Sequence, residues 1–149
     1  MIIRAESYHI SFYKHNTLHR TDGPARLWKD GTQEWYNHGQ LHRPDGPALE
    51  RLDGSRWWYI QGKLHREDGP AVMHVNGDRE WYFFNARHRT DGPAVTRLGK
   101  HKEWWYENVL HRTDGPAVTH EDGTQEWWLN GKYMDKFEHW ILANGKETI

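Results

Sequence analysis

Two things are absent from this sequence of 149 residues, and each absence excludes a class of protein. It has no cysteine, which excludes disulfides, thiolate metal ligands and a cysteine nucleophile. It also has no apolar run near the ~18 residues of a membrane-spanning helix, and its first residues lack the apolar core of a signal peptide. We therefore expect no membrane association and a cytoplasmic location.

An excess of one charge is missing too. The chain has 20 Lys+Arg and 21 Asp+Glu, which argues against a general polyanion coat and leaves a local basic stripe open. Its mean hydropathy of −1.08 is typical of disorder. However, 10 Trp, 7 Tyr and 4 Phe argue for folding, because disordered chains contain few aromatic residues. We expect a thin domain that buries large aromatic side chains.

The sequence does contain an internal repeat. The segment Leu-His-Arg-x-Asp-Gly-Pro-Ala recurs five times with a period of 23 residues and no insertion, and only Arg87 replaces the leucine. A tryptophan recurs with the same period, from Trp35 to Trp127. We expect one repeat domain over 1–149, with opening strands in 1–14, five 23-residue repeats in 15–134 and a degenerate C-terminal cap in 135–149.

Each repeat is predicted to contain two strands. In the third copy, Asn76-Gly77 separates two β-rich runs, which is typical of a two-residue hairpin with a primed turn. The return connection is longer and includes the repeated motif. The predicted fold is all-β: an open antiparallel meander of about six hairpins, one per repeat. A β-solenoid with one coil per repeat is the alternative.

The strands Trp58-Tyr59-Ile60-Gln61-Gly62-Lys63 and Trp128-Leu129-Asn130-Gly131-Lys132 resemble those of MORN-like repeats, especially the YwqK-like bacterial variants. The chain departs from that family in its His-Arg-x-Asp-Gly-Pro-Ala turn, which is similar to uncharacterised bacterial and bacteriophage repeats. The resemblance implies β-hairpin repeats and a binding or scaffolding role. It also implies an inhibitor, antitoxin or anti-defence function, and no catalytic residues.

A two-residue turn would fix which residues face each other across a hairpin. It predicts Leu49 opposite Trp58 and Val72 opposite Trp81, which are favourable cross-strand pairs. Nearer the hairpin tips it predicts a row of basic residues on the same face, and Glu34, Glu80, Glu103 and Glu126 on the other face. The expected partner-binding row consists of Arg51, Arg56, His74, Arg79, Arg97, Lys102 and His120. The alternative interpretation is that these are solvated side chains at the edge of the sheet, with no role in binding.

Repetition of the His-Arg-x-Asp-Gly-Pro-Ala motif favours a structural turn over an active site, because an active site is normally a single asymmetric cleft. Its aspartates are expected to bond backbone N–H groups as Asx-turns, and its arginines to stack on tryptophans or pair with the aspartates. The expected turn residues are His42, Asp45, His65, Asp68, His88, Asp91, His111 and Asp114. A shared metal is not expected, because histidines of neighbouring hairpins would lie ~9.6 Å apart.

The C-terminal segment predicts a short helix over the open edge of the sheet. Asp135 and Glu138 have the spacing of a capping box, Phe137, Trp140 and Ile141 follow at helical spacing, and Asn144-Gly145 is a stop signal. A sixth hairpin around Asn144-Gly145 is the alternative.

From these observations we expect a non-catalytic repeat protein that binds another macromolecule across its sheet, without a cofactor. A protein with an acidic surface is the expected partner. The alternative is a nucleic acid, held by the basic row and by aromatic stacking. The sequence leaves the oligomeric state open.

Overall fold

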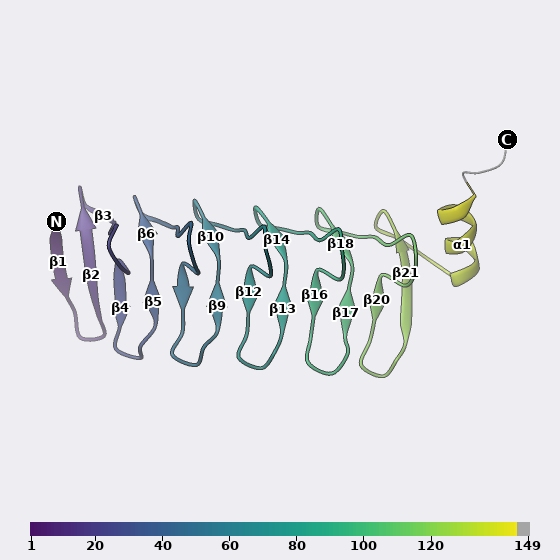
Figure 1. The fold of residues 1–149 in the computed structure, drawn as a ribbon, viewed down its shortest axis with the longest axis horizontal. Coiled ribbons are helices and arrows are strands. Elements are labelled where there is room, and N and C mark those ends of the chain that lie inside the picture. Colours follow the sequence, from purple (N-terminus) through teal and green to yellow (C-terminus); the bar gives the residue numbers. More distant parts are fainter. Residues whose placement is uncertain (146–149) are drawn as a thin grey trace.

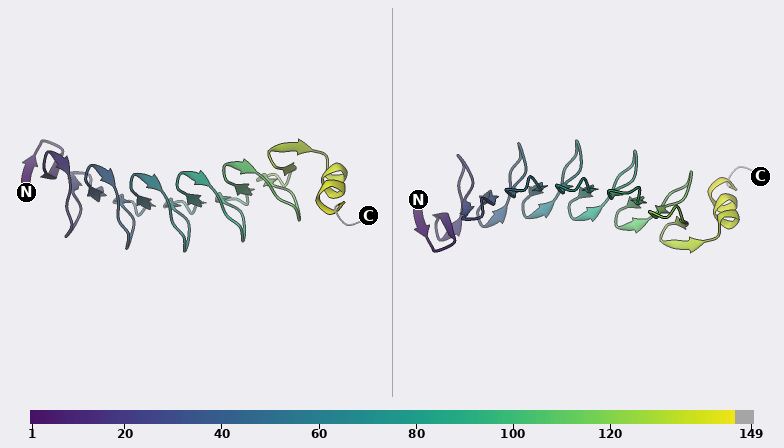
Figure 2. Two further views of the ribbon diagram at one scale, coloured as in Figure 1. Left: turned by 90° about the horizontal axis from the view of Figure 1, so that it is seen from above. Right: turned by 90° about the horizontal axis from the view of Figure 1, so that it is seen from below.

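The computed structural model describes residues 1–145 and shows one long, open antiparallel sheet that ends in a single helix (Figure 1). Successive repeats are stacked side by side in chain order, and the ends of the sheet lie far apart. The sheet is a meander of hairpins, so the predicted fold class is confirmed and the solenoid alternative is wrong. Figure 2 shows that the repeats follow a nearly straight axis and keep the same orientation along it.

The main sheet has 14 strands within the described residues, and its path runs β1-β2-β4-β5-β8-β9-β12-β13-β16-β17-β20-β21-β22, with β3 beside β2. The residues 1–14 form the expected opening hairpin, β1 with β2. The bounds are β1 Ile2–Ala5, β2 His9–Lys14, β3 Thr17–Leu18, β4 Arg26–Trp28, β5 Gln33–Glu34, β8 Leu49–Glu50, β9 Arg56–Trp57, β12 Val72–Met73, β13 Arg79–Glu80, β16 Val95–Thr96, β17 Lys102–Glu103, β20 Val118–Thr119, β21 Gln125–Leu129 and β22 Lys132–Met134.

Each central repeat carries a second, small hairpin that the sequence interpretation missed, because it treated this segment as a long return connection. These side hairpins project from the plane of the main sheet (Figure 2). Their turns hold the primed conformation: Gln61 and Gly62 have φ of 51° and 72°. The side hairpins pair β6 Tyr36–Asn37 with β7 Gln40–Leu41, β10 Tyr59–Ile60 with β11 Lys63–Leu64, β14 Tyr82–Phe83 with β15 Ala86–Arg87, and β18 Trp105–Tyr106 with β19 Val109–Leu110.

The Asp-Gly tips of the main hairpins are three-residue loops, not the predicted two-residue primed turns. At one tip, Arg51 N donates to Ser55 O and Gly54 N donates to Arg51 O, both at 3.0 Å. Gly54 has φ of 91°, which is the left-handed position of a G1 bulge. The Asp53 carboxylate accepts from Ser55 N at 2.7 Å and fixes the loop.

The longer tip loop shifts the register by one residue, so the predicted valine–tryptophan pairs are wrong. Val72 lies opposite Glu80 on one side and Trp57 on the other, and Val95 lies opposite Glu80 and Glu103. A one-residue shift moves one strand's side chains to the other face. We call the resulting surface the glutamate face; its central row comprises Val72, Val95, Val118, Glu80, Glu103 and Glu126.

The core is a thread of alanines rather than the expected layer of large aromatics. The motif alanines are fully buried, whereas the repeated tryptophans are only half-buried. The next residue completes the core in three repeats, because Val72, Val95 and Val118 are at most 5% exposed. The five alanines are Ala25, Ala48, Ala71, Ala94 and Ala117.

The C-terminal helix α1, Lys136–Asn144, confirms the helical prediction, and the sixth-hairpin alternative is wrong. Asp135 is its N-cap and accepts from Phe137 N and Glu138 N, each at 2.8 Å. The helix lies beside the end of the sheet (Figure 1) and buries His139, whose Nε2 bonds with Arg112 O at 2.6 Å. In the described part of the chain, no helix is long and apolar enough to cross a membrane.

Candidate binding surfaces of the repeat array

The repeated motif forms a closed loop around its arginine. In the third copy, the Arg66 guanidinium lies over the Trp58 ring at 4.2 Å, its Nε donates to Asp68 at 2.8 Å, and its Nη1 donates to Pro70 O at 3.4 Å. The expectation that arginine stacks on tryptophan and pairs with aspartate is confirmed. The same stack recurs for Arg43 on Trp35, Arg89 on Trp81 and Arg112 on Trp104, while Arg20 stacks on Phe12.

The predicted Asx-turns lie in a different place. The motif aspartates accept from the arginine of their own loop: Asp68 from Arg66, Asp91 from Arg89 and Asp114 from Arg112. Asp45 is the loosest, with its carboxylate 3.5 Å from Arg43 Nε. Instead, the Asx bonds occur in the tip loops, as at Asp53 and Asp122. The arginine outcompetes the backbone because its stacked guanidinium already lies beside the carboxylate.

The motif glycine packs closely against this arginine, and its backbone does not have the positive φ that favours glycine. A Cβ atom on Gly69 would lie 3.1 Å from Arg66 Cζ, and one on Gly115 would lie 2.8 Å from Arg112 Cζ. Such distances force the guanidinium to move. The sequence signal was present, since the glycine follows the arginine at the same spacing in every copy.

The motif histidines join neighbouring repeats. His42 Nδ1 accepts from Gln61 N at 3.1 Å, and His111 Nδ1 accepts from Asn130 N at the same distance. His19 and His88 accept in the same way. His65 differs, because its Nδ1 is buried without a hydrogen-bond partner among residues 1–145 and its ring stacks on Phe84 at 4.0 Å. Within those residues, no three His, Asp or Glu side chains come together as a possible metal site.

The structure splits the expected basic row between the two faces of the sheet. Arg56 lies opposite Glu50 rather than Arg51, and Lys102 lies opposite Thr96 rather than Arg97. Met73 faces Arg79, while the N–H of His74 donates to Asp78 O. His120 is likewise separated from Gln125, which faces Thr119. The predicted opposition of like charges is therefore wrong.

Four members of the predicted row lie beside the glutamate face and have partners there. Arg97 Nη1 donates to Glu80 at 2.8 Å and lies 3.6 Å from Asp78, so it is neutralised by Asp78 and by a glutamate that was expected on the far side. Arg51 lies over the Trp57 ring at 4.9 Å, and His74 packs edge-on against the same ring. His120 bonds with Glu126 at 2.7 Å.

Glu80 is the most buried charged group of the sheet, at 8% exposed. Burial opposes its ionisation, but hydrogen bonds from Arg97 and from the Tyr82 hydroxyl outweigh this, and the pKa of Glu80 lies below its ordinary value. Arg87 Nη2 contributes a third bond at 3.2 Å. Both oxygens of this carboxylate are therefore bonded: Oε1 to Arg97 of the next main hairpin, and Oε2 to Tyr82 and Arg87 of the adjoining side hairpin.

The remaining three members form a shorter row on the opposite face. Arg56, Arg79 and Lys102 lie on β9, β13 and β17, and the strands between them place Met73 and Thr96 in the same line. Each is two strands from the next, or ~9.6 Å. We call Arg56, Arg79 and Lys102 the cation row.

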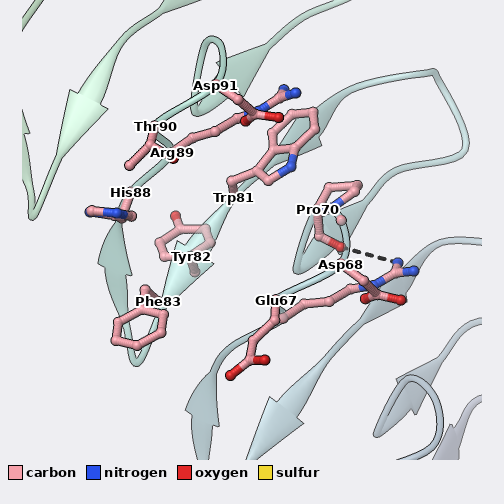
Figure 3. A pocket seen from close by; sticks show the side chains of 12 residues that line it. Glu67, Asp68, Pro70, Trp81, Tyr82, Phe83, His88, Arg89, Thr90 and Asp91 are labelled. Atoms are coloured by element: carbon pink, nitrogen blue, oxygen red, sulfur yellow. Dashed lines mark hydrogen bonds and ion pairs between the residues drawn. The ribbon is translucent and has the colours of Figure 1, made fainter.

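Grooves between successive motif loops are the feature that the sequence interpretation missed. One has a volume of about 690 Å³ and runs from the loop of Arg66 and Asp68 to that of Arg89 and Asp91, with Trp81 between them (Figure 3). Equivalent grooves of about 710 and 570 Å³ lie between the first and second loops and between the fourth and fifth. The constant spacing of the motif could have indicated them once the loops were known to fold around their arginines.

No family model matches the chain, and no curated protein matches its sequence. The resemblance to MORN-like repeats stays a prediction.

Proposed function

We propose that this protein is a non-catalytic repeat protein that binds another protein lengthwise along its sheet. The observation that carries the proposal is the recurrence of a like groove, lined by tryptophan, arginine and aspartate, between successive motif loops. Each groove combines a tryptophan wall with charged side chains from two loops, which offers both apolar and ionic contacts to a ligand. Repetition along a straight axis suits an elongated partner better than a compact one.

The chemistry of the grooves supports binding over catalysis. The arginines and aspartates are already paired with one another, and each is repeated from loop to loop. The charged cluster around Glu80, the most buried of the repeated glutamates, is closed by its own hydrogen bonds. Inhibition of a protein in a bacterium or phage is the form of this activity that the MORN-like resemblance implies.

A second candidate function uses the cation row. Arg56, Arg79 and Lys102 share one face, and Arg56 and Lys102 are exposed. Among the residues that the structure describes, Arg56 and Lys102 form no ion pair. An acidic protein surface or a nucleic-acid backbone would complement this row.

The test is capture of partners from a lysate of the encoding organism, on immobilised wild-type protein and two folded variants, with and without nuclease. Glu67→Lys/Thr90→Lys obstructs the groove of Figure 3 at positions that differ between repeats. Arg56→Glu/Arg79→Glu/Lys102→Glu reverses the cation row. We expect a protein that survives nuclease and is lost from the groove variant alone.

Loss from the cation-row variant alone would instead support the second candidate, and sensitivity to nuclease would identify its ligand as nucleic acid. A bound protein that neither variant loses would refute both surfaces.

A further inference from the structure

The lining of the grooves between motif loops indicates which kind of ligand they would bind. This inference rests on the proposed lengthwise binding of a protein. Each groove has an aromatic wall: Trp81 and Tyr82 line one, and Trp104 lines another. Pro70 lies on the opposite side of the first groove, and the polar groups come from the loops (Figure 3). Grooves lined by aromatic side chains are the common docking sites of proline-rich segments.

The charge that the loops present to solvent is negative. The motif arginines lie against the tryptophans and their side chains are only 23–27% exposed, whereas the aspartate side chains are 73–83% exposed. The hydrogen bond from Arg66 holds the pKa of Asp68 below its ordinary value, and Arg89 does the same for Asp91. A ligand that runs along the loops therefore meets a carboxylate at every repeat, with the balancing cation underneath.

The spacing of these carboxylates favours one backbone conformation of a bound peptide. Two strands per repeat separate equivalent atoms by ~9.4–9.8 Å. A polyproline II helix advances ~3.1 Å per residue with three residues per turn, or ~9.3 Å per turn. A β-strand repeats its side-chain direction every ~6.6–6.8 Å and an α-helix every ~5.4 Å, so neither remains in phase from loop to loop.

The straight axis of the array maintains that match (Figure 2). A difference of ~0.3 Å per repeat accumulates to only about 1 Å over the array, which flexible lysine side chains can absorb.

We propose that the motif loops bind a basic, proline-rich segment of a partner protein in the polyproline II conformation, with one Lys or Arg at every third residue. Each cation pairs with the exposed aspartate of one loop, and the intervening prolines pack in the grooves beside the tryptophans. Such a segment is already extended when free, so little conformational entropy is lost on binding.

The cation row makes it possible to test whether the ligand is basic or acidic. Met73 lies in line with Arg56 and Arg79, and its sulfur is 3.9 Å from Arg66 Nη1, so the cation row runs alongside the loops. A basic ligand is repelled by that row. The Arg56→Glu/Arg79→Glu/Lys102→Glu variant should therefore bind a basic peptide more tightly, whereas it should lose an acidic partner.

The experiment measures fluorescence anisotropy with labelled (Pro-Pro-Lys)5 at low salt. The comparison peptide has the same composition, with its lysines alternately two and four residues apart, and (Pro-Pro-Glu)5 is the charge control. We expect the in-phase peptide to bind about tenfold more tightly than the out-of-phase peptide, and (Pro-Pro-Glu)5 not to bind. Asp68→Asn/Asp91→Asn should weaken binding about fivefold, the effect of losing two exposed ion pairs.

Asp53→Asn/Asp122→Asn is the matched control, since it removes two carboxylates from tip loops and leaves amide oxygens to accept from Ser55 N and Thr124 N. It should leave peptide affinity unchanged. If the motif aspartate pair impairs folding, Glu67→Lys/Thr90→Lys provides the same test.

Three results would each overturn the proposal: no binding of (Pro-Pro-Lys)5, equal affinity for both lysine phases, or equal effects of the two aspartate pairs. If the groove variant still loses its captured protein while the peptides fail, the protein function stands and only this ligand assignment is wrong.

Discussion

The motif loops and the hairpin tips repeat with the same period of 23 residues, yet they are built in opposite ways. In a loop the arginine side chain bonds to the aspartate of the same loop, and this pairing is alike from copy to copy, as for Arg66 with Asp68 and Arg89 with Asp91. A tip forms further bonds with the neighbouring repeat, and these differ: Val75 N donates to Ser55 Oγ, whereas Leu98 N donates to the Asp78 carboxylate.

The loops and the tips therefore determine different properties of the array: the shape of each repeat and the order of the repeats. The invariant loops make every repeat the same shape, so they contain no record of which repeat follows which. The variable half of each hairpin contains that record, for example in the pairing of Arg97 with the Glu80 of the preceding repeat. Exchanging two repeats would therefore preserve every loop and break the contacts of the tips.

Removal of an indole from a loop is expected to have the largest effect. Trp81→Ala deletes the ring under Arg89, which lies 4.1 Å from it. We expect the free energy of unfolding to fall by about 3 kcal/mol, the lower end for such truncations because the ring is half-buried. Urea unfolding measures this, with Trp140→Ala, at 62% exposed, as a control that should be nearly neutral. Equal effects of the two changes would contradict the role given to the stack.

The two kinds of glycine provide the next comparison. Gly69→Asn pushes a Cβ against Arg66, which should release the guanidinium from Trp58 and Pro70 and cost about 2 kcal/mol. Gly54→Asn should cost less, about 1 kcal/mol, because its φ of 91° strains a side chain although nothing lies within 4 Å of its Cβ position. Thermal unfolding of both variants distinguishes them, and the opposite order would show that backbone conformation dominates at both sites.

Loss of the Glu80 charge is expected to have a smaller effect that depends on pH. At pH 7, Glu80→Gln should destabilise by about 1.5 kcal/mol, because it weakens the bonds to Arg97 and Arg87. The pKa of Glu80 is lowered by folding, so its contribution is complete above the unfolded value of about 4.3 and is lost as the pH falls through the lowered pKa.

Wild type and Glu80→Gln should consequently approach each other in stability below about pH 4. Unfolding measured from pH 3 to 7 tests this, with Glu121→Gln as the exposed control for loss of a carboxyl. A difference that stays constant over this range would show that folding does not lower the pKa of Glu80.

The two kinds of aspartate should differ least. Asp53→Ala leaves the N–H of Ser55 without its acceptor, whereas Asp68→Ala leaves a stacked arginine whose Nη1 still donates to Pro70 O. We therefore expect the tip substitution to lower the melting temperature more than the motif substitution. A larger drop for Asp68→Ala would return the main structural role to the motif aspartate.

The period, the open meander and the helical cap could all be read from the sequence, because repeat spacing and capping residues are local signals. The register could not, since Asp53-Gly54 suits both a two-residue turn and the tail of a three-residue loop, and the choice depends on the bond from Arg51 N to Ser55 O. This difference of one residue in the register determines whether Arg97 lies near Lys102 or pairs with Glu80.

The side hairpins were missed for a related reason. The stretch from Gln61 to Gly69 contains two turns, and only the second coincides with the conspicuous motif. The motif arginines were assigned correctly because stacking on a tryptophan of the same period is a short-range pairing. The grooves were not foreseen, since they exist only between two loops that have already folded.

Strand β1 and helix α1 lie at opposite ends of the sheet, and this determines how the molecule responds to pulling (Figure 1). Tension applied at the two ends acts across the strands, along the direction of the hydrogen bonds between neighbouring repeats, and those bonds open in sequence rather than together. The thread of small alanines offers no thick interior that must rupture at once. Each step releases one repeat of 23 residues, or roughly 80 Å of extended chain, so the array yields as a zipper under low force.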